Sequence, residues 1–229
     1  MLHGLEAPDI RNSIRNELAA LGAGQIAVND ADLTEPSAVE RLIDDTESAL
    51  GPVDILVNNA GLQHVAPIEA FPVDRWDVIQ KVILQSSFLA IRRVVPGMRQ
   101  RDWGRIINIV SAHGLVASRN KSAYVAAKHG QIGLTRTVAL ELAETRITTN
   151  AICPGFVRTP LVERQIEAQA QARNLSNEVV ARDVILASHP NRRFVEVEEI
   201  AALALYLCGS YAGSINGAAI AVDGGWTAC

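Results

Sequence analysis

The chain has 229 residues, which is enough for one α/β domain with a full hydrophobic core. It is 48% apolar and 20% charged with a net charge of −4, and this mild acidity argues against nucleic acid or an anionic membrane as a bulk partner. No run approaches the ~20 apolar residues that span a bilayer, and the N-terminus is too polar for a signal peptide.

Helical and extended patterns alternate along the chain. The helices are predicted over residues 8–21, 34–50, 74–100, 122–139, 161–188 and 197–208, and the strands over 25–29, 53–57, 105–110, 146–152 and 218–222. Thr34 and Asp74 are expected as N-caps, and Met1 to Leu5 is too short for a complete strand. The strands at 53–57 and 106–110 have the short apolar runs of buried parallel strands. The alternation therefore predicts a doubly wound, Rossmann-like parallel sheet.

Gly22-Ala23-Gly24 resembles part of a dinucleotide-binding fingerprint, but its place in the chain contradicts that reading. The fingerprint follows a strand and opens a helix. This triplet follows a predicted helix and precedes a strand, so we interpret it as a helix C-cap and a turn.

The stretch from Ile106 to Gly130 carries the strongest chemical signal. Ser111 follows a predicted buried strand, at the edge where open α/β sheets place their ligands. Tyr124 and Lys128 lie one helical turn apart and point the same way. A lysine ammonium beside a phenol lowers its pKa from about 10 and allows proton exchange with a carbinol or carbonyl oxygen, without a metal. A lone Y-x-x-x-K is weak evidence, because ordinary helices contain it by chance.

Several motifs together strengthen this interpretation. They are Asn58-Asn59-Ala60-Gly61, Ser111, Tyr124, Lys128, Pro154-Gly155 and Asp223-Gly224-Gly225. In this order and spacing they resemble the short-chain dehydrogenase/reductase family, from about Ala31 to the end of the chain. Six segments are similar to members of that family that oxidise (R)-3-hydroxybutyrate to acetoacetate with NAD: Gln63-His64-Val65, SAHGLVAS, NKSAYVAAKHG, NAICPG, RTPLVE and VDGGWTA.

The resemblance implies a role for each matching residue. The catalytic group would be Ser111, Tyr124 and Lys128. The residues near NAD would be Asp32, Leu33, Asn59, Ala60, Gly61, Tyr124, Lys128, Pro154, Gly155, Val157 and Thr159. Those around a small carboxylate substrate would be Gln63, Ser111, His113, Lys121, Tyr124, Phe156 and Gln165. Lys121 and His113 also suit this role chemically, as a cation and a hydrogen-bond donor for a carboxylate.

The chain departs from the family pattern at its start. The Gly-rich turn after the first strand is missing, so residues 1–229 are expected to form a single, N-terminally truncated domain that lacks the first strand–helix unit. The strand at 25–29 would then lack neighbours, and unpaired buried strand edges are costly. We expect the chain alone to be unstable or prone to aggregation.

Two single residues also depart from the pattern. Ile83 stands where the family has an asparagine in its proton-relay chain, and proton release is expected to slow roughly 10- to 10³-fold. Gln85 is nearby but is expected on a different helix face. Phe156 replaces a tryptophan, which keeps an aromatic ring but loses the indole N–H.

Three functional hypotheses follow. The first is NAD-dependent oxidoreduction of 3-hydroxybutyrate, with NADP not excluded. The second is a related dehydrogenase for another small hydroxy acid. The third is a truncated, inactive relative that acts only as an interaction subunit. The family implies a homotetramer, and Cys153, Cys208 and Cys229 are expected as reduced, mostly buried thiols of a cytoplasmic protein.

Overall fold

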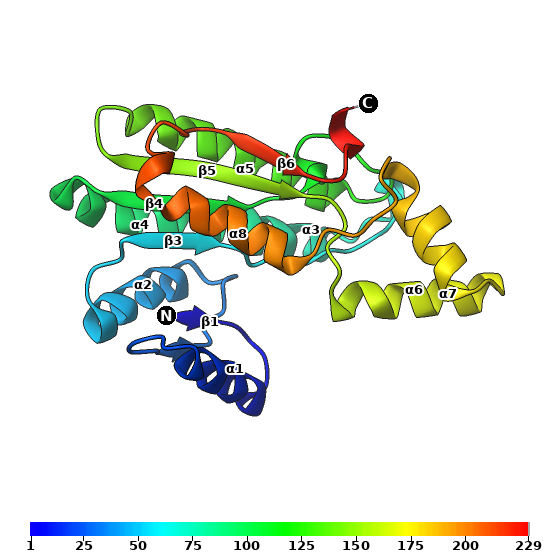
Figure 1. Ribbon diagram of the computed structural model, residues 1–229, viewed down its shortest axis with the longest axis horizontal. Coiled ribbons are helices and arrows are strands. Elements are labelled where there is room, and N and C mark those ends of the chain that lie inside the picture. The colour runs from blue at the N-terminus through cyan, green and yellow to red at the C-terminus, as the bar shows by residue number, and fades with distance from the viewer. Residues whose placement is uncertain (229) are drawn as a thin grey trace.

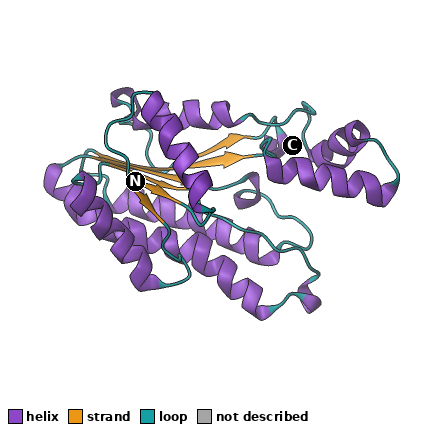
Figure 2. Ribbon diagram, turned by 90° about the horizontal axis from the view of Figure 1, so that it is seen from below, coloured by secondary structure: helices purple, strands orange, loops and turns teal. Residues whose placement is uncertain are grey.

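The core of the protein is a parallel sheet of four strands (Figure 1). The computed structural model describes residues 1–228, without the side chains of residues 160 and 161. The strands are β3 (Ile55–Asn58), β4 (Gly104–Ile109), β5 (Ile147–Pro154) and β6 (Ala219–Val222), in the order β3-β4-β5-β6. Helices lie on both sides of the strands (Figure 2). The predicted α/β class with a parallel sheet is confirmed.

The alternating side chains of β4 explain how both faces of the sheet are covered. Ile106 packs in a cluster with residues of α2 (Pro36–Leu50), α4 (Ser86–Arg101) and α5 (Ser122–Glu141). Its neighbour Ile107 points to the other face and packs against Leu207 of α8 (Val197–Cys208). Each is 1% exposed. Parallel strands that are buried on both faces need such continuous apolar sequence.

The strand at the β3 edge is less buried than the sequence predicts. Ile55 and Val57 are 45% and 48% exposed, so the prediction of a buried strand is wrong here. Register explains the exposure, because Val57 pairs with Ile107 and thus faces the α8 side. On that side α8 contacts β4 and β5. Leu56, on the other face, packs against the cluster of α2 and α4.

The N-terminal segment forms a separate two-stranded parallel sheet. Its strands are β1 (Leu2–His3) and β2 (Val28–Asn29), joined by α1 (Pro8–Ala20). The strand predicted over 25–29 is shorter than expected because only two of its residues pair with β1. Gly22 adopts φ 84° just after α1, and its N–H donates to the carbonyl of Ala19. The interpretation of this glycine as a helix C-cap is confirmed.

Helix starts differ from two predictions. α2 begins at Pro36 after Glu35, and Thr34 instead hydrogen-bonds Asp32 in the preceding turn. α3 (Val73–Gln80) begins after Pro72 and holds Asp74 in its first turn. Both helices have proline at or next to the first position, where its fixed φ and missing N–H suit the helix.

The long helix predicted over 74–100 is continuous in space but not regular. α3 passes into a π-helical turn at Lys81–Gln85 and then into α4, which contains Pro96 without ending there. The predicted helix over 161–188 is wrong as a single element. α6 (Pro160–Arg173) ends at Asn174, which has φ 53°, and α7 (Asn177–Val179) leads into a π turn at Val180–Val184.

Short 3₁₀ turns complete the described chain. They lie at Ile68–Ala70, Ala112–Gly114, Ile185–Ser188, Ser210–Ala212 and Trp226–Ala228. Within residues 1–228, no helix combines the length and apolar character that a bilayer span requires.

Candidate active site

Ser111, Tyr124 and Lys128 come together at the carboxyl end of β4. Ser111 lies two residues after the end of this strand, and its hydroxyl hydrogen-bonds the Tyr124 side chain. Tyr124 and Lys128 both lie on α5, and the Lys128 Nζ is 5.7 Å from the centre of the Tyr124 ring. The structure therefore assembles the three residues that the sequence predicts as a catalytic group.

The charges in this group differ from the prediction. Burial raises the pKa of Tyr124, and the hydrogen bond with Ser111 acts in the opposite direction. Burial also lowers the pKa of Lys128 to about 7, so this lysine is only partly charged near neutral pH. The expectation that Lys128 lowers the pKa of Tyr124 is wrong for this geometry, because burial acts on both groups against their charged forms.

A wall of aromatic rings stands beside Tyr124. The His113 ring centre is 6.0 Å from that of Tyr124 and 5.0 Å from that of Trp226. Phe156 stacks parallel to Trp226 with centres 6.0 Å apart, and His189 contacts both rings. The pKa of His113 is lowered to about 4, first by burial and then by the nearby Lys121 charge. His113 is therefore neutral at physiological pH.

Two members of this wall, Trp226 and His189, are not among the predicted site residues. The buried Asp223 carboxylate accepts hydrogen bonds from the Gly225 and Thr227 N–H groups and so forms the turn that carries Trp226. Burial alone raises the pKa of Asp223, but these bonds outweigh it and the pKa is lowered. The aromatic residue directly after Asp223-Gly224-Gly225 could have indicated Trp226 as a site residue. No sequence feature indicates His189.

Lys121 places a cation beside this wall. Its Nζ lies 5.6 Å from the centre of the Phe156 ring, and burial lowers its pKa. A half-buried ammonium beside apolar rings suits a small anion. Gln63 and Gln165 are both exposed, and none of the hydrogen bonds described for the chain joins them to Lys121 or His113. The structure thus brings together part of the predicted substrate set.

The residues predicted near the cofactor lie mostly along the same edge of the sheet. Gly61 is close to Lys128, since a Cβ added there would lie 3.9 Å from the Lys128 Nζ. Asn59 and Gly61 are exposed, and Ala60 is half-buried. Asp32, exposed beyond β2, hydrogen-bonds Thr34.

Others of this set shape the backbone after β5. Gly155 hydrogen-bonds the Val222 carbonyl, and a Cβ at this position would lie 2.3 Å from the His189 Nε2. Pro154 is buried, and Val157 bridges to Val195. Thr159 accepts a hydrogen bond from the Val162 N–H and caps α6. Only Leu33 packs away from this edge, against the cluster of α2 and α4.

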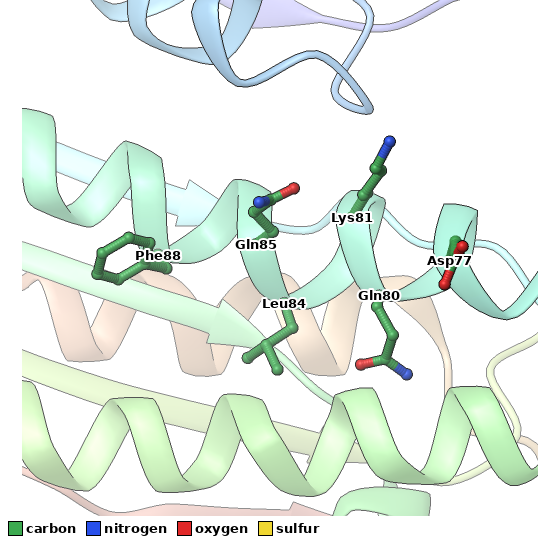
Figure 3. A pocket seen from close by; sticks show the side chains of 6 residues that line it. All are labelled: Asp77, Gln80, Lys81, Leu84, Gln85 and Phe88. Carbon is green, nitrogen blue, oxygen red and sulfur yellow. The ribbon is translucent and has the colours of Figure 1, made fainter.

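The helix register around Ile83 agrees with the predicted departure. Ile83 is fully buried and packs with Ile79, Ala123 and Ala127. Gln85 is exposed, so it lies on a different helix face from the buried Ile83, as predicted. Figure 3 shows Gln85 pointing to the opposite side of the helix from Leu84. The side chains drawn there line a pocket beside this helix, and they belong to Asp77, Gln80, Lys81, Leu84, Gln85 and Phe88.

The cysteines do not enter the chemistry of this group. Cys153 is buried, and burial raises the pKa of its thiol to about 11. Cys208 is half-buried with a raised pKa, and Cys229 lies outside the described residues. In residues 1–228, His, Cys, Asp and Glu side chains form no group of three that could hold a metal ion.

Comparison with known proteins supports the class that the fold and site define. A family described as enoyl-(acyl carrier protein) reductase matches residues 5–227. D-beta-hydroxybutyrate dehydrogenase of Rhizobium meliloti (strain 1021) is 52% identical over 228 residues, covering 100% of this chain and 88% of the relative. The enzyme of the same name from Cupriavidus necator is 48% identical, covering 95% and 84%.

A third relative shows that likeness to this class does not guarantee activity. Inactive 2-(S)-hydroxypropyl-CoM dehydrogenase 2 of Xanthobacter autotrophicus is 37% identical over 92% of this chain and 88% of the relative. The chain belongs to the short-chain dehydrogenase/reductase family. Membership implies an oxidoreductase with a small-molecule substrate and a nicotinamide nucleotide cofactor.

Proposed function

We propose that this protein interconverts (R)-3-hydroxybutyrate and acetoacetate by hydride transfer with NAD. The proposal rests on the convergence of Ser111, Tyr124 and Lys128 beside the aromatic wall, with the half-buried Lys121 next to that wall. The two relatives named D-beta-hydroxybutyrate dehydrogenase support the choice of substrate.

The proton steps follow from the positions of these side chains. In the oxidation, the deprotonated form of Tyr124 takes the proton of the substrate hydroxyl, while the hydride would pass from the carbinol carbon to the nicotinamide. Ser111, which hydrogen-bonds Tyr124, holds the same substrate oxygen. In the reverse direction Tyr124 donates its proton to the ketone oxygen. The raised pKa of Tyr124 keeps it protonated at neutral pH and favours this reverse step.

The substrate carboxylate would lie against Lys121 and His113. Lys121 supplies the charge, and neutral His113 supplies one ring N–H for a hydrogen bond. Phe156 and Trp226 would exclude water from the same pocket, since they stack in parallel beside the His113 ring. Gln63 and Gln165 are proposed to join on substrate binding.

The nicotinamide end of the cofactor fits the described residues. Gly61 places no side chain beside the Lys128 Nζ, which lies 3.9 Å from the position of a Cβ there, and Gly155 allows the backbone to run close to His189. Lys128 and Tyr124 would hold the ribose there, with Asn59, Ala60, Pro154, Val157 and Thr159 along the edge and Asp32 and Leu33 toward the adenine. A nicotinamide nucleotide supplies the acceptor for the hydride.

The test is a direct assay of the purified protein. We expect (R)-3-hydroxybutyrate to reduce NAD, with little turnover of the (S) enantiomer or of NADP. NADH binding is measured separately by fluorescence. Lack of binding at millimolar cofactor would disprove the enzymatic proposal and favour the interaction subunit, whereas binding with turnover of another hydroxy acid would favour the related dehydrogenase.

We further propose a homotetramer in the cytoplasm that does not bind nucleic acid or membranes. Exposed apolar side chains on α4 and α5, Phe88 at 47% and Leu140 at 78%, support association between copies. The net charge of −4 argues against binding to polyanions. Light scattering measures the mass, and a monomer at micromolar concentration would contradict the tetramer.

A further inference from the structure

The buried lysine of the candidate site is held by a glutamine. The Lys128 Nζ donates to the Ile109 carbonyl at 2.8 Å and to the Gln131 Oε1 at 3.0 Å. Lys128 and Gln131 are 2% and 1% exposed. A buried ammonium is costly unless acceptors surround it, so each of these two oxygens matters to the charged form.

Both ends of the Gln131 amide have partners. Its Nε2 donates to the Ser87 Oγ at 2.8 Å and to the Ile83 carbonyl at 3.1 Å. The Ser87 hydroxyl donates to the same carbonyl at 2.7 Å. The orientation of the amide is therefore determined, since a flipped amide would place its NH₂ group against the ammonium.

The Ile83 carbonyl that accepts these bonds lies within a π-helical turn. Within Lys81–Gln85, the Ser86 N–H donates to the Lys81 carbonyl, five residues earlier. Such a turn disturbs the regular bonding of an α-helix and is frequent at functional sites. The Ile83 side chain faces an apolar cluster and contributes no hydrogen bond, so the polar contact with α5 is made by the Ile83 backbone and by Gln131.

We propose that Gln131 is a positioning residue for Lys128. Its amide supplies the polar side-chain contact at this helix interface that the apolar Ile83 side chain cannot make. This inference deepens the proposed function. Gln131 lies one turn after Lys128 on α5 and connects the lysine to the helix on the opposite side of the contact. An amide neither gains nor loses a proton near neutral pH, so Gln131 fixes the lysine without carrying its proton.

The pKa of Lys128 itself is the decisive measurement, because it does not depend on activity. The chain has only three lysines, Lys81, Lys121 and Lys128, so isotope-labelled lysine gives three NMR signals to titrate. The titratable groups that face Lys128 are the Tyr124 phenol on the same helix and the Cys153 thiol of β5. Lys128→Arg identifies its signal.

Three variants separate the proposed role from general packing. Gln131→Leu removes an acceptor from the ammonium, and we expect the pKa of Lys128 to fall by about one unit. Gln131→Glu keeps the volume and adds a negative charge, and we expect the pKa to rise. Gln80→Leu is the control, since Gln80 also connects neighbouring helices, through the Ala123 carbonyl, but does not bond Lys128. It should leave the pKa unchanged.

An unchanged pKa in Gln131→Leu would overturn the proposal. If that variant does not fold, Gln131→Glu decides, and a pKa that does not rise would overturn it equally. Where turnover is detectable, Ile83→Asn introduced into Gln131→Leu should recover part of the lost kcat, and no recovery would show that the two positions do not serve the same lysine. A protein without turnover would disprove the proposed function, while the titration would still decide the role of Gln131.

Discussion

The two parallel sheets of this protein differ in how deeply their strands are buried. In the larger sheet, every residue of β5 is buried, because α5 covers one face and α8 the other. In the smaller sheet, both residues of β1 and of β2 remain partly exposed. α1 contains no buried residue. Parallel strands become stable when helices cover both faces, and the central strands β4 and β5 of the larger sheet have this cover.

The boundary between the two regions falls before α2. Val39 and Ile43 of this helix are 1% and 4% exposed and pack with Ile106 of β4. α1 is instead held by contacts at the surface, such as the ion pair of Arg11 with Asp30. Surface ion pairs contribute little, so we expect the N-terminal region to contribute little to the free energy of unfolding.

The largest expected effect is catalytic, and it is confined to the region of the larger sheet. Tyr124→Phe should lower kcat roughly 10²- to 10⁴-fold, since it removes the proposed acid and base. The free energy of unfolding should change little, because the ring is kept. Tyr206→Phe is the matched control, as Tyr206 is 51% exposed on α8. Comparable kcat values for the two variants would show that Tyr124 does not transfer the proton.

Core substitution should separate the regions by stability. Ile106→Ala is expected to lower the free energy of unfolding by about 2–5 kcal/mol, because it opens a cavity in a closed cluster. Ile14→Ala in α1, at a position 41% exposed, should change it by less than about 0.5 kcal/mol. Chemical denaturation measures both. Equal losses would mean that α1 belongs to the same cooperative core.

The difference between the regions also explains what could be predicted from sequence. Ser111, Tyr124 and Lys128 were predictable because a strand end and one helix turn fix their positions locally. The exposure of Ile55 and Val57 was not, because it depends on which helices reach the α8 face of β3. The prediction of a lowered pKa for Tyr124 was wrong for a related reason, since the burial that raises this pKa is a property of the assembled site.

The aromatic wall and the Gln131 network show the same limit. Trp226 and Phe156 are about seventy residues apart in the sequence, and their rings come into contact only in the folded chain. No local sequence spacing predicts this contact. Gln131 looks like an ordinary helix residue until α5 packs against the π-helical turn. Chemistry fixed by local structure can therefore be predicted from the sequence, whereas contacts between distant elements are seen only in the folded structure.

A smaller effect is expected from the pH dependence of stability. The pKa of His113 is about 4 in the folded state against an ordinary value of 6.5, so the unfolded state binds a proton at higher pH. Stability should therefore fall as the pH drops from about 6.5 to about 4, by roughly 2 kcal/mol after solvent screening. His113→Gln should reduce this loss, and the exposed His129→Gln should not. Equal acid sensitivity of the two variants would contradict the assignment to His113.

The smallest free energies should be those of local opening in the N-terminal region. Amide groups of α1 are expected to exchange with solvent through openings of nearly zero free energy, whereas those of β4 and β5 should require global unfolding. α2 is the internal standard, because it follows α1 in the chain but packs on Ile106 and should be protected. The expectation that the chain is prone to aggregation is supported by the β3 edge, where the apolar side chains of Ile55 and Val57 are already exposed in the folded chain. A single cooperative melt, with the amides of α1 as well protected from exchange as those of β4, would contradict both expectations. It would show that the two sheets unfold as one stable unit.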